Sequence, residues 1–201
     1  MFITLEGIEG SGKSTLAALL TKTLQSGGRQ VVFVREPGGT ALGNAVRAIF
    51  LDKDLQIDSI AELMLINASR RALVNEVIRP ALGSGAVVVC DRYVDSTRAY
   101  QGFGRGLDLT EIDRVCGLAT GELEPDVTLL LDLDIVTSQQ RLMQRGGARD
   151  RMEKEANDFH TRVREGFLAL AQRYPRIHRC DATQPVEQLL ERALSCIASL
   201  H

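Results

Sequence analysis

The chain has 201 residues and a formal net charge of −2, from 24 Lys and Arg against 26 Asp and Glu. That length suits a single domain spanning residues 1–201, and the charge gives no field that would attract a polyanion, so we expect no nucleic-acid partner. We find neither a secretory signal nor the roughly 18 apolar residues of a membrane span, and therefore expect a cytoplasmic protein without a membrane partner. The 4 cysteines are widely spaced, with no C-x-x-C pair, which argues against zinc and disulfides.

Short apolar runs alternate with longer helical patterns along the chain. The expected strands are Phe2–Leu5, Val31–Val34, Ala86–Cys90, Val127–Leu131 and Ile177–Cys180. The expected helices are Lys13–Gln25, Ala41–Leu51, Ser59–Leu82, Thr110–Thr120, Thr137–Arg145, Met152–Arg173 and Val186–Leu200. This rhythm, with nearly continuous apolar strands, predicts an α/β fold: a three-layer α/β/α arrangement around a five-stranded parallel sheet.

Two local features accompany these helices. Thr110, followed by acidic residues, is expected to cap the helix that it begins. Gly102, Gly104 and Gly106 are expected to mark a flexible segment just before it.

Right-handed crossovers bring the carboxyl ends of parallel strands to one rim of a sheet. We therefore expect the segments that follow the first four strands to converge on one site. These segments are Glu6–Ser14, Arg35–Thr40, Asp91–Gly102 and Asp132–Asp134.

The first segment contains a phosphate-binding motif. Residues 7–14 read Gly-Ile-Glu-Gly-Ser-Gly-Lys-Ser, which matches G-x-x-x-x-G-K-[ST] between an expected strand and an expected helix. Gly10 and Gly12 allow backbone angles that point N–H groups at phosphate oxygens. Lys13 would reach the β- and γ-phosphates, and the Ser14 hydroxyl would help to hold Mg²⁺. The alternative is a glycine-rich turn that matches by chance, but the strand and the helix around it favour nucleotide binding.

Two further segments carry charged residues directly after a strand. Asp91 can hold Mg²⁺ through water, and Arg92 can clamp a second phosphate, unless the two are only a surface ion pair. In the run Arg35-Glu36-Pro37-Gly38-Gly39-Thr40, the proline and glycines make a turn that would hold Arg35 and Glu36 at the rim. A plain turn is the competing interpretation.

A basic stretch surrounds Gly146-Gly147 and contains Arg141, Arg145, Arg149 and Arg151. A glycine-hinged loop of this kind, at about residues 145–152, can fold over phosphates as a lid, exclude water and neutralise charge during phosphoryl transfer. For any single arginine, a solvated position at a helix end is the alternative. Asp150 and Glu153 partly balance the charge, which favours a lid over a nucleic-acid patch.

Together these segments resemble the bacterial thymidylate kinases, which belong to the nucleoside monophosphate kinase branch of the phosphate-loop (P-loop) fold. Glu6–Thr15, Arg35–Thr40 and Asp91–Tyr93, the last followed by Ser96 and Ala99–Gly102, look like the three main signatures of that family, in order and at its spacing. The resemblance runs across nearly the whole chain. It implies that ATP and thymidine monophosphate (dTMP) are converted into ADP and thymidine diphosphate, with Mg²⁺. It also implies a homodimer, for which the long helix Ser59–Leu82 is a candidate surface.

The resemblance also implies roles for single residues. The acceptor nucleotide would contact Glu9 at its 3′-hydroxyl, Tyr100 at its 2′ position, Arg70, Thr97 and Gln101 at its base, and Arg35 and Arg92 at its phosphate; Glu36, Arg47 and Ile66 complete this site. ATP would contact Gly7, Ile8, Glu9, Gly10, Ser11, Gly12, Lys13, Ser14, Thr15 and Arg141. Ser14 and Asp91 would hold the Mg²⁺ ion. Lys13, Arg92 and the lid arginines Arg149 and Arg151 would stabilise the transferring phosphoryl group.

The chain departs from the family pattern at Ile66, where a phenylalanine usually stacks on thymine. Base–aromatic stacking is worth about 1 to 3 kcal/mol, of which a branched aliphatic side chain recovers only the contact part. We therefore expect weaker dTMP binding than is usual in the family, or relaxed selection against deoxyuridine monophosphate (dUMP).

Three other functions compete with this interpretation. Another monophosphate kinase would share the phosphate loop but not the segments from Arg35 and Ala99. A GTPase-type switch would need an Asn-Lys-x-Asp segment, which the sequence lacks. A non-catalytic protein on a decayed kinase scaffold is disfavoured because Lys13, Ser14, Asp91 and Arg92 are all present.

Overall fold

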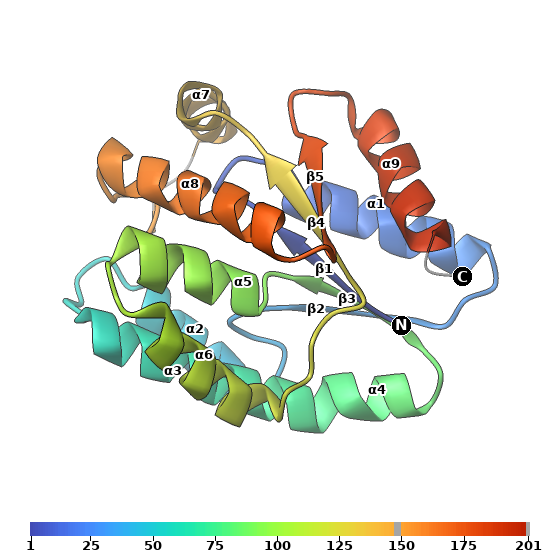
Figure 1. Ribbon diagram of the computed structural model, residues 1–201, viewed down its shortest axis with the longest axis horizontal. Helices are drawn as coiled ribbons and strands as arrows, with labels where there is room; N and C mark the ends of the chain where they lie inside the picture. The colour runs from blue at the N-terminus through green and yellow to red at the C-terminus, as the bar shows by residue number, and fades with distance from the viewer. Residues whose placement is uncertain (147–149, 200–201) are drawn as a thin grey trace.

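A five-stranded parallel sheet lies at the centre of the computed structural model, which describes residues 1–146 and 150–199 (Figure 1). Its strands are β1 (Phe2–Glu6), β2 (Val31–Arg35), β3 (Val87–Asp91), β4 (Val127–Asp132) and β5 (Ile177–Asp181), in the spatial order β2-β3-β1-β4-β5. The predicted sheet is confirmed. Each strand runs one residue further than predicted at its carboxyl end, and that last residue is always charged. Charged residues therefore line the carboxyl edge of the sheet, where the site was expected.

The three central strands are buried along their whole length, because helices cover both faces of the sheet. The edge strands β2 and β5 are partly exposed. The described helices are α1 (Lys13–Ser26), α2 (Ala41–Leu51), α3 (Ser59–Leu73), α4 (Arg79–Gly83), α5 (Val94–Thr97), α6 (Leu109–Thr120), α7 (Ile135–Arg145), α8 (Asn157–Arg173) and α9 (Val186–Ala198). Two π-helical segments, η1 (Val74–Ile78) and η2 (Arg98–Gly104), join α3 to α4 and extend α5.

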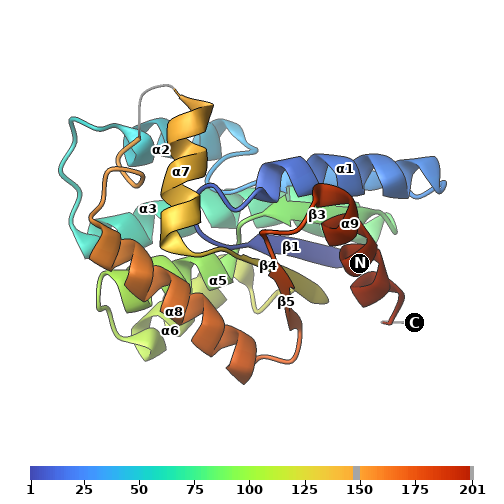
Figure 2. The ribbon, with the colours of Figure 1, turned by 90° about the horizontal axis from the view of Figure 1, so that it is seen from above.

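The helices form the two expected layers. Helices α1 and α9 pack together on one face of the sheet, and α8 packs on the opposite face against η2 (Figures 1 and 2). Helices α3 and α6 lie in the same layer as η2. Helix α7 stands beside the carboxyl ends of the strands (Figure 2). No helix within residues 1–146 and 150–199 combines the length and the apolar character needed to cross a bilayer.

The helix cap predicted at Thr110 and the helix start predicted at Met152 are wrong. The helix expected from Thr110 is capped by Asp108, whose carboxylate accepts hydrogen bonds from the Thr110 and Glu111 amides at 2.8 and 3.1 Å. The helix expected from Met152 begins only at Asn157, because residues 150–156 form turns between α7 and α8.

The glycine-containing segment after β3 was predicted to be flexible, and this prediction is also wrong for Gly102 and Gly104. Both lie buried in η2. A Cβ at Gly102 would lie 2.5 Å from Leu109, and one at Gly104 would lie 2.7 Å from Phe159. The glycines are therefore needed for close packing of η2 against α6 and α8.

Candidate active site

Two adjoining clefts open at the carboxyl rim of the sheet. The first cleft, of about 230 Å³, lies between the loop after β1, the turn after β2, helix α3 and the segment after β3. The second cleft, of about 490 Å³, lies between the same loop, α7 and the start of α9. Gly10, Lys13, Ser14 and Arg145 line both clefts, so a molecule in one cleft lies next to a molecule in the other.

Most of the predicted site residues line these clefts. The first cleft includes Glu9, Gly10, Lys13, Ser14, Arg35, Glu36, Arg47, Ile66, Arg70, Asp91, Arg92, Thr97, Tyr100 and Gln101, and the second includes Gly10, Ser11, Gly12, Lys13, Ser14, Thr15 and Arg141. Gly7 and Ile8 line neither cleft and contribute backbone carbonyls instead.

The prediction that Asp132–Asp134 joins the site is wrong. Asp132 lies 2.7 Å from Arg164 of α8 and 2.6 Å from Arg179 of β5. Asp134 caps α7 by accepting a hydrogen bond from the Thr137 amide. These partners hold both carboxylates away from the clefts.

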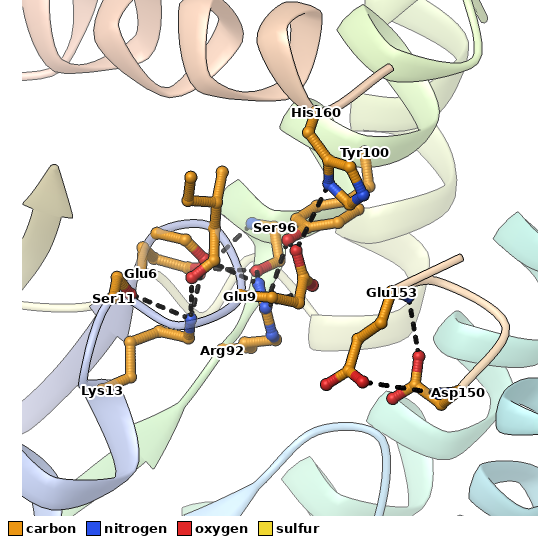
Figure 3. Close-up of polar contacts among 12 residues, drawn as sticks. Glu6, Glu9, Ser11, Lys13, Arg92, Ser96, Tyr100, Asp150, Glu153 and His160 are labelled. Atoms are coloured by element: carbon orange, nitrogen blue, oxygen red, sulfur yellow. Dashed lines mark hydrogen bonds and ion pairs between the residues drawn. The ribbon is translucent and has the colours of Figure 1, made fainter. Parts of the chain in front are cut away.

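The loop after β1 has the geometry of a phosphate cradle. Gly10 and Gly12 have φ angles of 72° and 92°, in the left-handed region that favours glycine. Lys13 reaches back across the loop, and its Nζ donates to the carbonyls of Gly7 at 2.9 Å and Ile8 at 2.8 Å (Figure 3). Because these acceptors are neutral carbonyls, an incoming phosphate can replace them and bind the ammonium group of Lys13.

Burial at this position disfavours the charged form of Lys13. Its side chain is buried, and desolvation together with the nearby Arg92 guanidinium lowers the pKa of Lys13 to about 8. An anionic ligand in the cradle would reverse this shift, because it favours the protonated amine.

Ser14 and Asp91 meet between the two clefts. The Ser14 hydroxyl donates to Asp91 Oδ2 at 2.8 Å, although the two residues are 77 positions apart. Within the described residues, His, Cys, Asp and Glu form no group of three or more that could hold a metal ion. One carboxylate and one hydroxyl fit Mg²⁺, a hard cation that takes most of its other ligands from phosphates and water.

Arg92 joins the loop after β1 to the segment after β3. Its φ angle is 74°, an unusual value for a residue with a side chain. The guanidinium donates to the Gly7 carbonyl at 3.0 Å, Glu9 Oε1 at 2.9 Å and the Tyr100 hydroxyl at 3.1 Å, and it lies over the Tyr100 ring (Figure 3). Such strain at a charged residue is characteristic of functional sites.

Glu6, which sequence reasoning did not assign to a role, holds this strained segment. Its carboxylate accepts hydrogen bonds from the Tyr93 amide at 2.8 Å, the Ser96 amide at 3.2 Å and the Ser96 hydroxyl. Burial, with Asp95 nearby, raises the pKa of Glu6 to about 7. A carboxylate on the last residue of a buried strand was the one signal in the sequence, since such a group needs partners.

Glu9 projects from the loop into the first cleft. Its Oε1 accepts from Arg92 and from the Tyr100 hydroxyl at 2.6 Å, while Oε2 is buried without a hydrogen-bond partner. His160 of α8, which sequence reasoning missed, places Nδ1 at 3.6 Å from Oε2 (Figure 3). Burial favours the neutral acid, but Arg92 and Lys13 outweigh it and lower the pKa of Glu9. Oε2 is thus a charged acceptor that is open to a ligand donor.

Arg35 and Arg47 supply positive charge at the other side of the first cleft. Arg47 donates to the Pro37 carbonyl at 3.1 Å. Neither arginine has an acidic partner within salt-bridge distance in the described part of the chain. Burial and the nearby Arg35 lower the pKa of Arg47. Two neighbouring cations without carboxylates favour an anionic ligand between them.

The deep end of the first cleft is polar and buried. Arg70, which is 1% exposed, uses all five of its N–H donors: two reach Glu36 Oε2, and the others reach Asn67, Thr97 and Cys116. Because Thr97 Oγ1 accepts from Arg70, its own hydroxyl hydrogen is available to another acceptor. Ile66 contributes the apolar wall.

The basic stretch divides into different environments. Arg141 donates to the Ala182 carbonyl at 3.0 Å, beside the second cleft. Arg145 lines both clefts, has a 57% exposed side chain and pairs with Glu153 at 2.8 Å. Arg151 lines neither cleft and instead donates to the Phe50 carbonyl and pairs with Glu62. The predicted Arg149 lies outside the described residues.

Comparison with known proteins gives consistent matches. The sequence model of the family described as thymidylate kinase matches residues 5–193. The thymidylate kinase of Deinococcus radiodurans is 49% identical over 190 residues, covering 94% of this chain and 92% of that protein. The one from Gloeobacter violaceus is 49% identical over 199 residues, covering 98% and 94%. A crystal structure of thymidylate kinase from Ehrlichia chaffeensis aligns with a TM-score of 0.78 at 36% identity, covering 96% of this chain and 98% of that chain.

The lowered pKa of Lys13 predicts a pH-dependent affinity for nucleoside triphosphates. Because the bound phosphates raise this pKa again, binding takes up a proton above pH 8, and the affinity should fall towards about tenfold per pH unit from there. Calorimetric titration with a non-hydrolysable triphosphate between pH 7 and 9.5 measures this slope. Lys13→Met should bind more weakly and without the step above pH 8. A parental affinity that stays constant to pH 9.5 would contradict the prediction.

Proposed function

The chain belongs to the thymidylate kinase family, and on this premise we propose that it transfers the γ-phosphoryl group of ATP to the phosphate of dTMP. The observation that carries the proposal is the boundary that the two clefts share at Gly10, Lys13 and Ser14. ATP in the second cleft would extend its terminal phosphate past these residues. The dTMP phosphate, held in the first cleft by Arg35, Arg47 and Arg92, would meet it there.

The reaction needs alignment and charge neutralisation more than it needs a base. A nucleotide phosphate oxygen is already anionic near neutral pH, so it can attack the γ-phosphorus once the two groups are in line. Lys13 and Arg92, which both donate to the Gly7 carbonyl, would stabilise the transferring group. Glu9, with its open oxygen, would accept the 3′-hydroxyl of the acceptor sugar, and Tyr100 would crowd its 2′ position.

Mg²⁺ fits the donor set of Ser14 and Asp91, whose oxygens lie 2.8 Å apart. When bound there, the ion would neutralise part of the negative charge of the nucleotide phosphates. Asp91 serves this positioning role and abstracts no proton.

The proposal includes a cytoplasmic homodimer. The apolar side chains of Ile60 and Met64 on α3 are 47% and 53% exposed, which supports this helix as the contact surface between two copies.

The central test is the substrate spectrum. Purified protein with ATP, Mg²⁺ and each nucleoside monophosphate in turn should release ADP fastest with dTMP. Lys13→Ala should abolish transfer and leave the circular dichroism spectrum unchanged, because it removes the phosphate-binding charge and no core packing. Preference for guanylate, cytidylate or adenylate would favour another monophosphate kinase. No ADP with any acceptor, or parental turnover by Lys13→Ala, would refute the mechanism.

Ile66 predicts incomplete recognition of the base. Ile66→Phe should lower KM for dTMP by about fivefold, equivalent to roughly 1 kcal/mol of added stacking. It should also sharpen the preference for dTMP over dUMP. Ile66→Leu is the matched control, because it changes the shape of the side chain without adding a ring. If steady-state kinetics show the parental KM and base preference in Ile66→Phe, Ile66 does not limit recognition of the base.

The arginine of the lid that neutralises charge during phosphoryl transfer can be identified by comparing two alanine variants. We propose Arg145, which lines both clefts, beside the sequence candidates Arg149 and Arg151. Arg145→Ala should lower kcat at least tenfold at constant melting temperature, because its exposed side chain lines both clefts, where the phosphates would meet. Arg151→Ala should mainly lower the free energy of unfolding, by about 1 to 3 kcal/mol, because it removes a partner of buried Glu62. Loss of kcat without loss of stability in Arg151→Ala would return the role to Arg151.

A further inference from the structure

Glu62 of α3 is a buried carboxylate that neither the phosphate chemistry nor the metal uses. Its side chain is 0% exposed, yet it lies one helical turn from Ile66 at the wall of the first cleft. Arg105 donates to it with Nη2 at 2.8 Å and Nε at 3.2 Å, and Arg151 donates to its Oε1. A carboxylate that binds two guanidinium groups offers only acceptors to its other neighbours.

The remaining partner of Glu62 is Gln101, which lines the first cleft. Gln101 Nε2 donates to Glu62 Oε2 at 3.0 Å. Only the nitrogen of an amide can donate to a carboxylate, so this bond fixes which way the Gln101 amide faces. Its Oε1 is left over, and that oxygen is buried without a hydrogen-bond partner in a side chain that is 1% exposed. A buried acceptor without a donor is costly, and a ligand can supply the donor.

We propose that Glu62 is a positioning residue that makes the site select pyrimidine bases carrying an N3–H group. This inference rests on the proposed function, since it concerns the base of the acceptor nucleotide. With Gln101 Oε1 held as an acceptor, thymine and uracil can donate N3–H to it. Cytosine presents an unprotonated N3 at the same place, so two acceptors would face each other in a buried site. The Thr97 hydroxyl, which Arg70 leaves free to donate, suits a carbonyl oxygen of the same base edge.

The positioning role depends on charge as well as shape. A glutamine at position 62 could accept from Gln101 Nε2, or it could turn over and donate to Gln101 Oε1. In the second arrangement Gln101 Nε2 would face the base and pair with N3 of cytosine. Glu62→Gln should therefore lose base discrimination through Gln101, without any direct contact between residue 62 and substrate.

The experiment compares kcat/KM for dTMP, dUMP and deoxycytidine monophosphate (dCMP). In Glu62→Gln, the preference for dTMP over dCMP should fall at least tenfold. The preference for dTMP over dUMP should not change, because both bases carry N3–H and differ only in the methyl group. General damage to the site, or a catalytic loss through Arg151, would lower all three rates and leave the ratios unchanged. A Glu62→Gln enzyme with the parental ratio of dTMP to dCMP would overturn the proposal.

Two further variants make the test specific. Glu155→Gln removes the other carboxylate bound to Arg105, at 2.6 Å, and has no bond to Gln101, so it should keep the parental selectivity. In a Gln101→Ala background, Glu62→Gln should cause no additional loss of the dTMP preference over dCMP. An additional loss of tenfold or more there would show that Glu62 acts by another route and overturn the assignment.

Glu62→Asp keeps the negative charge for both arginines and shortens the arm that reaches Gln101. If Glu62→Gln does not fold, Glu62→Asp decides the question by the same ratios: a tenfold loss of preference over dCMP supports the proposal, and the parental ratio overturns it. The proposed function fails separately, because in that case the parental enzyme itself would not phosphorylate dTMP.

Discussion

The rest of the site depends on the buried carboxylate of Glu6. This residue ends β1, and its three hydrogen bonds to Tyr93 and Ser96 tie that strand to the segment after β3. The constraint holds Arg92 in a left-handed conformation, which costs of the order of 1 to 3 kcal/mol. Because Arg92 also bonds to the Gly7 carbonyl and to Glu9, the phosphate loop and the acceptor side form one unit. Positioning of two phosphates then follows from the fold and needs no rearrangement of the strands.

Two cations at the clefts, Lys13 and Arg47, have neutral partners that a phosphate can replace. Lys13 donates to two loop carbonyls, and Arg47 donates to one carbonyl in the turn after β2. Exchange of a neutral carbonyl for an anionic oxygen strengthens each hydrogen bond. Arginines with a structural role have stronger partners, since Arg70 and Arg164 are held by carboxylates. Arg92 and Arg145 have both properties, because each lines a cleft and also pairs with a carboxylate.

The sequence predicted features that local pattern determines. The five strands follow from the apolar runs, and the meeting of Ser14 with Asp91 follows from crossover handedness. The conformations of Gly10 and Gly12 follow from the phosphate-loop motif. It could not predict pairings that depend on how distant elements pack. Glu62 and Arg151 are 89 positions apart. Gly104 looked flexible because α8, which fills the space beside it, comes more than fifty residues later. The wrong placement of Asp132 has the same origin, since its guanidinium partners come from α8 and β5.

The two ends of the first cleft recognise a ligand by opposite strategies. At the proposed phosphate end, positive charge is abundant and the hydrogen bonds of Lys13 and Arg47 go to replaceable carbonyls, so recognition there depends on charge. At the base end, Arg70 has no spare donor and Gln101 is fixed by Glu62, so each group there offers one polarity only. A site that leaves a buried acceptor unpaired rejects the wrong base more strongly than one that relies on size. Ile66 contributes only non-directional apolar contact to the base. Selection between bases therefore depends mainly on the buried hydrogen bonds.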